Sequence, residues 1–442
     1  MKKIQKILVA NRGEIALRAI RTIKEMGKEA VAVYSTADKD AEYLKFADMA
    51  ICIGSVKSNE SYLNIPSIMA AVDISGCDAV FPGYGFLSEN QNFVEICKYQ
   101  NIIFIGPSVE LMATMSDKSK AKEVMKKAGV PVILGSEGAI KDIEDAKKLA
   151  KKIGYPVIVK ASAGGGGRGM RVVENEDYLE NAFLAAGSEA LNAFGDGTLY
   201  MEKYIRNPRH VEVQVVADKY GNAIHLGERD CSLQRRHQKL IEESPATILD
   251  EKTRQKLLNT AVKATKAIGY ENAGTFEFLV DSNKNFYFME MNTRLQVEHT
   301  ISEMVSGVDI IELMIKVAEG EKLLSQDKVH LKGHAIECRI TAEDPEKFIP
   351  SPGKITKWIT PGGRNVRIDS HVYCNYTVSP YYDSMIGKLI VWGEDRNSAI
   401  AKMRESLNEF SVEGIKTIIP FHKKMMTNID FVENNYDTNY LG

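Results

Sequence analysis

The sequence has little of what marks secreted, disulfide-bonded or membrane-bound proteins. It contains six cysteines in 442 residues. No two of them form a C-x-x-C pair, so no disulfide framework is indicated. The apolar run near the N-terminus covers only residues 7–10, which is too short for the core of a signal peptide. No stretch approaches the ~18 apolar residues that a membrane span needs. These absences predict a soluble, cytoplasmic protein with no membrane partner.

An excess of one charge is missing as well. Lys and Arg number 57 against 59 Asp and Glu, so the formal net charge is -2 with His neutral. This balance argues against a protein that coats nucleic acid or an anionic membrane. The hydrophobic share of 44% excludes general disorder. The length of 442 residues predicts roughly three domains.

The first part of the chain lacks a dinucleotide-binding glycine motif, although its pattern otherwise fits such a domain. Strand-like apolar runs alternate with helix-length segments, and the runs cover residues 7–10, 31–34, 50–53, 78–81 and 102–105. This alternation predicts a parallel sheet covered on both faces, as in a Rossmann-like domain. The first turn, Asn11-Arg12-Gly13, is not G-x-G-x-x-G, so NAD binding is disfavoured.

A glycine-rich loop is the first sign of phosphate chemistry. Residues 163–169 read Ala-Gly-Gly-Gly-Gly-Arg-Gly and lie between strand-like runs at 157–160 and 170–173. Backbone N–H groups of glycine can approach phosphate closely because no Cβ intervenes. The loop is not a Walker A motif, since Met170 and Arg171 follow it in place of Lys-Ser/Thr. We predict a hairpin flap that closes over a nucleotide, and the strand-like flanks disfavour the alternative of a linker.

Two further strand-like runs predict a β-hairpin that binds a metal. The runs are Thr-Phe-Glu-Phe-Leu and Phe-Tyr-Phe-Met-Glu-Met-Asn, and a two-residue loop at 283–284 places Glu277 opposite Glu290. Side-chain alternation puts Glu290 and Asn292 on one face. Two carboxylates and an amide oxygen suit Mg²⁺, which also offsets the cost of burying the acids. The alternative is that both glutamates face solvent on an amphipathic sheet.

The segment that follows the hairpin places an arginine and a carboxylate beside the predicted metal site. Arg294 and Glu298 lie on an extended stretch, where an arginine can hold a small oxyanion next to a carboxylate base. An ordinary surface ion pair is the alternative. Thr300 and Glu303 match a capping box and predict the start of a helix. A basic run at residues 228–239 could collect phosphate or bicarbonate charge, and its lack of interleaved aromatics disfavours nucleic acid.

Taken together, these segments resemble the biotin carboxylase family of the ATP-grasp superfamily. The resemblance rests on five runs, at residues 8–16, 81–90, 164–170, 227–239 and 290–299, and it covers essentially the whole chain. It implies that the chain makes carboxybiotin from ATP, bicarbonate and biotin through carboxyphosphate. This is the first half-reaction of a biotin-dependent carboxylase. Acetyl-CoA carboxylase, in fatty-acid synthesis, is the favoured complex, and pyruvate or propionyl-CoA carboxylase is the alternative.

The resemblance also implies roles for individual residues. ATP would be bound by Lys118, Lys160, Gly164, Gly165, Gly166, Gly167, Gly169, Met170, Glu202, Lys203, Ile205, His210, Gln234, His237 and Leu279. Mg²⁺, or Mn²⁺, would be held by Glu277, Glu290 and Asn292. Bicarbonate would be bound by Lys239, Arg294, Gln296, Val297, Glu298 and Arg339. Of these, Glu298 would deprotonate bicarbonate, and Lys239, Arg294 and Arg339 would complete the catalytic set. Biotin would contact Tyr84 and Arg339, and Arg339 would stabilise its enolate-like oxygen.

The implied fold class is mixed, α/β and α+β, in three domains. A Rossmann-like N-terminal domain is expected over residues 1–115. An ATP-grasp domain follows over 116–330, with its lid at about 131–204, and a strand-rich C-terminal domain covers 331–442.

Expected partners follow from the same resemblance. The family's carriers attach biotin at Ala-Met-Lys-Met, and this tetrapeptide does not occur here. We therefore expect a separate biotin carboxyl carrier protein, with carboxyl transfer on carboxyltransferase subunits. A homodimer is expected, because Arg18, Arg21 and Glu25 match positions used for dimerisation in the family. The more remote alternatives are another ATP-grasp ligase and a nucleotide-sensing subunit that has lost catalysis.

Overall fold

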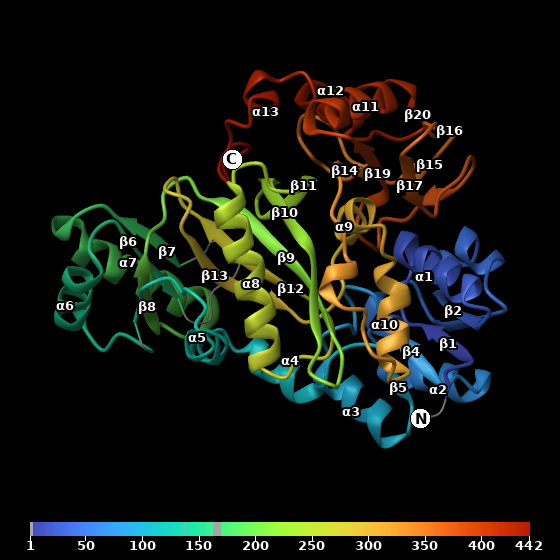
Figure 1. The fold of residues 1–442 in the computed structure, drawn as a ribbon, viewed down its shortest axis with the longest axis horizontal. Helices are drawn as coiled ribbons and strands as arrows, with labels where there is room; N and C mark the ends of the chain where they lie inside the picture. The colour runs from blue at the N-terminus through green and yellow to red at the C-terminus, as the bar shows by residue number, and fades with distance from the viewer. Residues whose placement is uncertain (1–2, 137, 162–168) are drawn as a thin grey trace.

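The computed structural model of the chain describes residues 3–136, 138–161 and 169–442. Figure 1 shows the N-terminal elements in blue at one side of the body and the C-terminal elements in red above them. A large antiparallel sheet lies in the middle, and a smaller lobe, in green, projects from the opposite side. The predicted phosphate-binding residues Gly164, Gly165, Gly166 and Gly167 lie outside the described residues.

The N-terminal part is a parallel sheet with helices on both faces, as predicted. Its strands, in the order β3-β2-β1-β4-β5, are β1 (Lys6–Val9), β2 (Glu29–Ser35), β3 (Met49–Gly54), β4 (Ala79–Phe81) and β5 (Ile103–Phe104). The covering helices are α1 (Gly13–Glu25), α2 (Ile65–Ser75) and α3 (Gln91–Tyr99). Ile7 of β1 belongs to the core cluster that contains Ile20 of α1. The adjacent Leu8 belongs instead to the cluster that contains Ile68 of α2 and Phe93 of α3, because successive side chains of a strand point to opposite faces.

A single eight-stranded sheet joins the centre of the chain to its C-terminal part. Its order is β13-β12-β9-β10-β11-β14-β19-β17, and every pair is antiparallel. The strands are β9 (Arg209–Ala217), β10 (Ala223–Arg235), β11 (Gln238–Ser244), β12 (Asn272–Val280), β13 (Phe286–Asn292), β14 (His334–Thr341), β17 (Val366–Ser370) and β19 (Met385–Gly393). The sheet therefore continues past the domain limit predicted at residue 330, because β14 pairs with β11.

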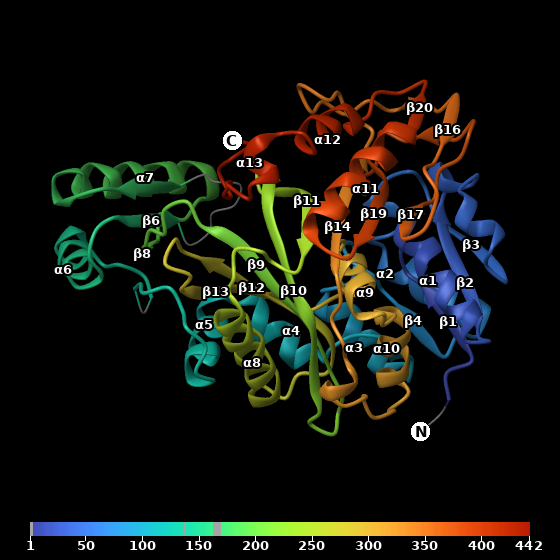
Figure 2. The ribbon, with the colours of Figure 1, turned by 45° about the horizontal axis from the view of Figure 1, so that its top comes forward.

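The two faces of the central strands differ in chemistry. On β9, Val211, Val213 and Val215 pack in one core cluster with Leu257 of α8 (Glu251–Ala267). Figure 2 shows this helix beside β12 and β10, on one side of the sheet. The alternate residues His210, Glu212 and Gln214 point to the other face, and they are buried polar groups. Burying several polar side chains on one face costs free energy unless they bond to one another, so this face is where a site is expected.

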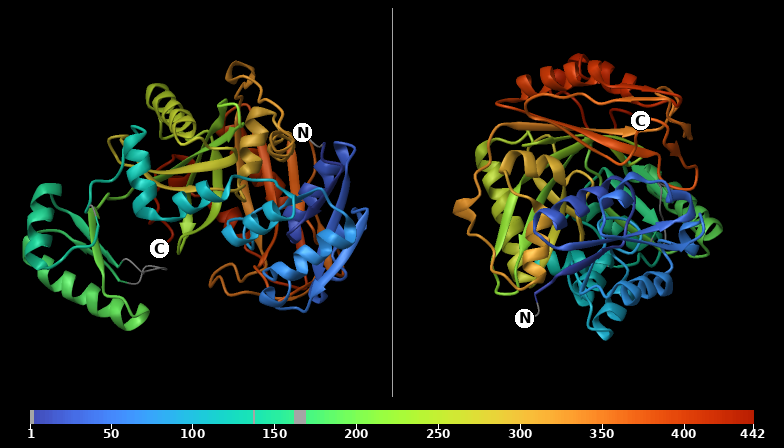
Figure 3. Two further views of the ribbon diagram at one scale, coloured as in Figure 1. Left: turned by 90° about the horizontal axis from the view of Figure 1, so that it is seen from below. Right: turned by 90° about the vertical axis from the view of Figure 1, so that its right-hand side faces the viewer.

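The lobe is a three-stranded sheet packed on two helices. Its strands, in the order β7-β6-β8, are β6 (Val157–Ala161), β7 (Met170–Val173) and β8 (Leu199–Lys203), and its helices are α6 (Ile143–Ile153) and α7 (Leu179–Phe194). β6 and β7 pair antiparallel, which confirms the two strands predicted to flank the glycine loop. Figure 3 shows the lobe standing apart from the N-terminal sheet.

The remaining elements connect and cover these sheets. The other helices are α4 (Val109–Ser116), α5 (Lys118–Lys127), α9 (His299–Ser306), α10 (Ile310–Ala318), α11 (Arg396–Glu409), α12 (Ile419–Met425) and α13 (Ile429–Val432). The short strands are β15 (Gly353–Lys354), β16 (Lys357–Ile359), β18 (Thr377–Val378) and β20 (Ser411–Glu413). Among the described residues, no helix is both long and apolar enough to cross a membrane.

The capping box predicted at Thr300 is wrong. α9 begins at His299, and Glu298 occupies its N-cap position, two residues before the predicted N-cap. The hydroxyl of Thr300 donates to the buried carboxyl of Glu337, and Glu303 forms an ion pair with Arg18 at 2.9 Å. Both side chains are therefore bonded to distant strands and helices, and the local pattern could not show those partners.

Candidate active site

The predicted pairing of Glu277 with Glu290 is confirmed, but a different turn produces it. The N–H of Asp281 donates to the carbonyl of Asn285 at 2.9 Å, so the loop has three residues rather than two. A register irregularity between Glu277 and Phe278 then brings Glu277 opposite Glu290. The Asn292 amide donates to Glu277 Oε1 at 2.9 Å, which places all three predicted metal ligands on one end of the hairpin.

Lys239 is the cationic centre of the site. It lies at the start of β11, and its Nζ donates to three carboxylates, those of Glu212 at 2.7 Å, Glu277 at 3.1 Å and Glu298 at 2.6 Å. Burial disfavours the ammonium charge, but the three carboxylates raise the pKa of Lys239 well above its ordinary value. Lys239 is therefore a permanent cation in this structure.

Glu298 is a buried carboxylate held between two cations. Its Oε1 accepts from Lys239, and its Oε2 accepts from Arg339 Nη2 at 3.0 Å. Burial alone would raise its pKa, but Lys239 and Arg339 hold the pKa of Glu298 below its usual range. An ionised carboxylate with one cation on each oxygen can accept a proton from an anionic substrate bound by the same cations.

Arg339 reaches this site because β14 pairs with β11. It lies two residues beyond Glu337, which is directly opposite Glu242 of β11. Arg339 Nε donates to Glu242 Oε1 at 2.6 Å, while Nη2 meets Glu298. A strand of the C-terminal part thus supplies a cation to a site that the central strands otherwise build.

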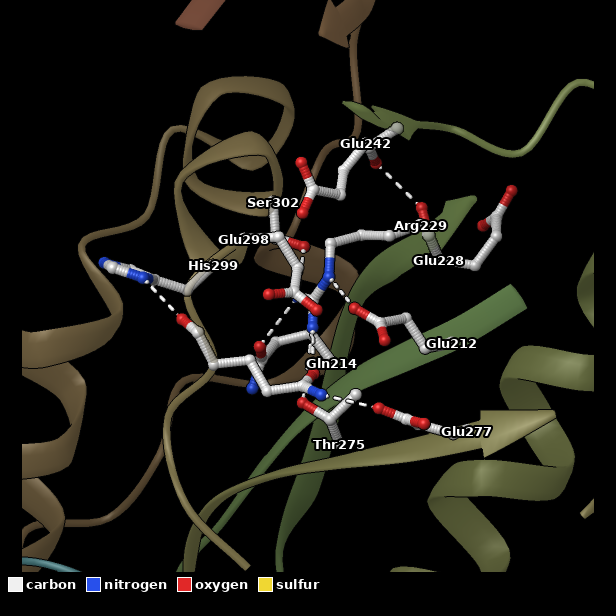
Figure 4. Close-up of polar contacts among 12 residues, drawn as sticks. Glu212, Gln214, Glu228, Arg229, Glu242, Thr275, Glu277, Glu298, His299 and Ser302 are labelled. Atoms are coloured by element: carbon white, nitrogen blue, oxygen red, sulfur yellow. Dashed lines mark hydrogen bonds and ion pairs between the residues drawn. The ribbon is translucent and has the colours of Figure 1, made fainter. Parts of the chain in front are cut away.

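A fully buried arginine forms the floor of the site, and sequence reasoning missed it. Arg229 and Glu277 lie directly opposite Glu212 on the two strands that flank β9. Arg229 donates to Glu212 at 2.5 Å, to Gln214 at 2.8 Å and to Gln296 Oε1 at 2.8 Å, as Figure 4 shows for the first two. The bond from Arg229 to Oε1 orients the Gln296 amide, so that Gln296 Nε2 donates to Glu277 at 2.7 Å.

Arg229 is therefore a structural residue. The basic side chains of residues 228–239 were expected to collect phosphate or bicarbonate charge, yet the Arg229 side chain has an exposure of 0%. The signal that could have identified it is the alternation Arg229, Cys231, Leu233 on β10, which places the arginine on an inward-facing row.

Arg294 is held by a residue of the N-terminal part. Its Nε donates to Glu89 Oε2 at 2.9 Å and its Nη2 donates to Asn292 Oδ1 at 2.9 Å. Glu89 also accepts from the N–H of Thr293 at 3.0 Å. Glu89 stands within the run at 81–90 that supported the family resemblance, but no role was predicted for it. Glu89, Glu290 and Asn292 line a cavity of about 210 Å³ together with Lys118.

His210 lies against the acidic face of the hairpin. Its Nε2 is 3.1 Å from Glu277 and 3.7 Å from Glu212. Burial opposes the imidazolium charge, but Glu277 outweighs it and raises the pKa of His210 to about 9. Leu279 pairs with His210 across β9 and β12, so these two predicted nucleotide contacts are neighbours.

Several residues predicted to contact the nucleotide lie in the lobe. Lys160 donates to Glu202 at 2.6 Å, and Lys122 of α5 forms a second ion pair with Glu202. Lys203 points elsewhere, because its Nζ donates to the carbonyls of Gly154 and Tyr155 at 3.0 and 2.8 Å. Lys122 had no predicted role, since a lysine-rich helix carries no sign of which lysine turns inward.

The other predicted contacts are distributed over both parts. Met170 pairs with Lys160 in the lobe, and Gly169 adopts a φ of +69° where an added Cβ would lie 2.8 Å from Ala161 Cβ. Ile205 follows β8. Gln234 pairs with Lys239 at the end of the β10–β11 hairpin, and His237 is exposed in its turn.

The predicted biotin contact Tyr84 belongs to a buried chain of contacts between the parts. Its hydroxyl donates to Glu14 of α1. Glu14 lies 3.2 Å from Lys388 of β19, and Lys388 Nζ donates to the carbonyl of Val297 at 2.8 Å. Tyr84 and Val297, predicted to contact biotin and bicarbonate, are thus joined through two buried charged residues.

Comparisons with protein families agree across the chain. Family models match it in three consecutive stretches. Residues 3–112 match "Biotin carboxylase, N-terminal domain", residues 117–326 match "Carbamoyl-phosphate synthase L chain, ATP binding domain", and residues 337–442 match "Biotin carboxylase C-terminal domain".

Individual proteins match over nearly the whole length. The biotin carboxylase of Nostoc sp. is 55% identical over 441 residues, covering 99% of both chains. A pyruvate carboxylase subunit from Methanothermobacter thermautotrophicus is 53% identical over 99% of this chain and 89% of its own. The crystal structure of a biotin carboxylase–β-γ-ATP complex from Campylobacter jejuni is 72% identical, with a TM-score of 0.94 over 99% of this chain and 98% of that one. The chain belongs to the biotin carboxylase family.

Proposed function

We propose that this chain carboxylates biotin at the expense of ATP and bicarbonate. The observation that carries the proposal is the position of Glu298, which is ionised between Lys239 and Arg339 and lies beside the acidic hairpin. A nucleotide-binding protein without catalysis has no need for a buried base between two cations, because burying these charges costs free energy that ion pairing only offsets. This arrangement also disfavours a sensing subunit.

The polar face of the central sheet fits a small oxyanion. Lys239, Arg294 and the amide of Gln296 would bind bicarbonate together with the backbone of Val297. Glu298 would remove its proton, and the resulting oxygen would attack the γ-phosphorus of ATP, so that ADP leaves and carboxyphosphate forms. Its breakdown would give CO₂ and a phosphate that takes the ureido proton of biotin. Arg339 would stabilise the enolate-like oxygen, and Tyr84 would line the same side.

The hairpin residues fit a divalent cation. Burial and the facing Glu277 both raise the pKa of Glu290, because a buried carboxylate is disfavoured beside a second one. Glu277, Glu290 and Asn292 offer the oxygen donors that Mg²⁺ or Mn²⁺ prefers. When bound, the ion would neutralise phosphate charge. Lys118, Lys160 and the lobe, including its glycine loop, would hold the ATP phosphates.

We propose domain limits at 1–115, 116–330 and 331–442, with a lid at about 131–204. Biotin would arrive on a separate carrier protein, and carboxyltransferase subunits would complete the complex. Acetyl-CoA carboxylase is favoured because relatives named biotin carboxylase match the full chain, and the pyruvate carboxylase relative supports the second candidate.

We propose a homodimer whose contact uses two of the three residues predicted for it. Arg18 is buried and forms ion pairs with Glu303 and Asp309 of its own chain, so it is not available to a partner. Arg21 and Glu25 are exposed on α1 and remain candidates for the dimer contact. Sedimentation of the purified chain, and of a variant with both side chains replaced by Ala, tests this assignment.

The activity is tested by ATP cleavage in the presence of bicarbonate and free biotin. We expect ADP release to require bicarbonate, to increase with biotin and to be accompanied by carboxybiotin. Absence of both the biotin stimulation and the product would exclude the proposal. Purification of the complex from its source, followed by identification of the carboxyltransferase, would decide between the two candidate complexes.

A further inference from the structure

Two glutamates that the proposed mechanism does not use lie directly opposite each other behind Arg339. Glu242 of β11 pairs with Glu337 of β14, and both residues have a relative exposure of 0%. Like charges at directly opposite positions of an antiparallel pair destabilise a sheet. Two carboxylates without access to water are costlier still. Their coexistence therefore requires neutralisation by partners or by a proton.

Hydrogen-bond donors reach only half of the pair's oxygens. Glu242 Oε1 accepts from Arg339 Nε at 2.6 Å, and Glu337 accepts from the hydroxyl of Thr300. In the described part of the chain, Glu242 Oε2 and Glu337 Oε1 have no hydrogen-bond partner. A buried carboxylate oxygen without a hydrogen-bond donor costs free energy. The protonated carboxylic acid avoids this cost, because it is neutral and carries its own hydrogen.

The pair shares its nearby cations with other acids. Arg339 also binds Glu298, and Lys388 donates to the carbonyl of Val297 and lies near Glu14. The charged and titratable groups around the pair come from β11, β14, β19, α1 and two loops, and they are Lys239, Arg339, Lys388, Glu14, Glu298 and Tyr84. The thiols of Cys231 and Cys338 are close as well. The pair thus adds two carboxyls to a region whose three cations already serve other carboxylates.

We propose that Glu242 is a positioning residue for Arg339 and that Glu337 is a neutral carboxylic acid in the working enzyme. The bond from Arg339 Nε to Glu242 fixes the plane of the guanidinium group, so that Nη2 meets Glu298. Ionisation of Glu337 would add a second charge behind Arg339 and draw the guanidinium away from Glu298. In agreement, burial raises the pKa of Glu337 to about 8, above the value of about 7 for Glu242, so that Glu337 is the carboxyl group of the pair that keeps the proton. The proposal rests on the role proposed above for Arg339.

Kinetics of two amide variants test the two halves of the proposal. In E242Q the acceptor for Arg339 loses its charge, and we expect the KM for bicarbonate to rise on the order of 10-fold, with the KM for ATP unchanged. In E337Q the amide replaces a neutral acid, so activity near neutral pH stays close to that of the wild type. The alkaline limb of its kcat/KM profile for bicarbonate should move to higher pH. A profile that superimposes on the wild type, or a wild-type bicarbonate KM in E242Q, would overturn the proposal.

Infrared spectroscopy tests the proton directly and does not depend on activity. The wild-type chain near neutral pH should show the C=O stretch of a buried carboxylic acid, and the difference spectrum against E337Q should contain that band. The band should disappear as the pH rises through about 8. Absence of the band in the difference spectrum would refute a neutral Glu337. If the wild type showed no biotin-dependent ATP cleavage, the proposed function would fail, while the spectrum would still decide the state of Glu337.

Discussion

Glu89 holds Arg294 from the other side of a domain boundary, through a bond of 2.9 Å from Arg294 Nε to Glu89 Oε2. Glu89 follows β4 of the N-terminal sheet, whereas Arg294 follows β13 of the central one. The same carboxylate accepts from the backbone N–H and the hydroxyl of Thr293. The N-terminal part, which lacks a dinucleotide motif, therefore shapes the proposed bicarbonate site.

We predict that E89A raises the KM for bicarbonate and leaves the KM for ATP nearly unchanged. The guanidinium would lose an ionic hydrogen bond worth about 1.5–3 kcal/mol, which corresponds to roughly a 10- to 100-fold change. Steady-state kinetics with each substrate varied separately measure both constants. E95Q, at an exposed position of α3, is the control. Equal increases in both constants would indicate general damage instead of misplacement of Arg294.

Replacement of the proposed base should separate chemistry from nucleotide binding. We expect E298Q to lower turnover by ~10²-fold or more, because the amide cannot accept the bicarbonate proton. ATP affinity, measured by calorimetry, should remain, since Lys160 bonds to Glu202 in the lobe whereas Glu298 bonds to Lys239 and Arg339. E413Q, which removes an exposed ion pair with Lys357, should behave as the wild type. Normal turnover in E298Q would remove Glu298 from the base role.

The buried Arg229 should matter more for folding than any exposed arginine. R229M leaves Glu212 without its arginine in the interior, and breaking a buried pair in this way costs about 3–5 kcal/mol. Denaturant unfolding measures the loss, and R171Q at an exposed ion pair should change little. The double variant R229M/E212M should recover part of the stability, because neither charge is then left alone. If R229M alone were as stable as the wild type, this explanation would be wrong.

Gly169 should not tolerate a side chain. G169A combines a φ of +69° with a Cβ that would lie 2.8 Å from Ala161 Cβ, so we expect the lobe to lose about 1–3 kcal/mol of stability. Hydrogen exchange of β6 and β7 reports on the lobe alone. G129A has a similar φ of +79° with nothing within 4 Å of the added Cβ, so it measures the backbone strain without the contact. Equal losses of stability in G169A and G129A would show that the contact with Ala161 does not destabilise the lobe.

The buried carboxyl pair predicts how stability depends on pH. The pKa of Glu337 is about 8 in the folded chain and about 4.3 when unfolded. The folded state therefore holds a proton that the unfolded state lacks. This contribution to stability is fully present below about pH 4.3 and is lost as pH rises through about 8. Thermal unfolding midpoints should fall over this range, and the fall should be smaller in E337Q. Identical slopes would argue that Glu337 is ionised throughout.

Local patterns predicted the elements that depend on local contacts. The parallel strands and their helices followed from alternating apolar runs, and Glu277 faces Glu290 as the two runs suggested. The turn between them differed, because a register irregularity near Phe278 leaves no mark in residue types. Thr300 shows the same limit. Its hydroxyl bonds to Glu337, which lies 37 residues further along the chain.

Contacts between distant segments could not be predicted without the family resemblance. Nothing near Arg339 shows that β14 pairs with β11, and this pairing alone brings the arginine to Glu298. Likewise, Arg229 and Lys239 belong to one basic run, yet the first is fully buried beneath the site and the second lies at its centre. The residue types showed the charge of both side chains, whereas only the alternation along β10 indicated that Arg229 is buried.

The continuity of the eight-stranded sheet limits how the chain can be divided. A cut between α10 and β14 would separate β11 from β14 and leave each fragment with a row of unpaired N–H and C=O groups. Such edges associate with other chains, so the two fragments expressed separately should aggregate, whereas co-expression should allow them to reassemble. Any engineered split of this protein is therefore better placed in the loops that join the lobe to the body.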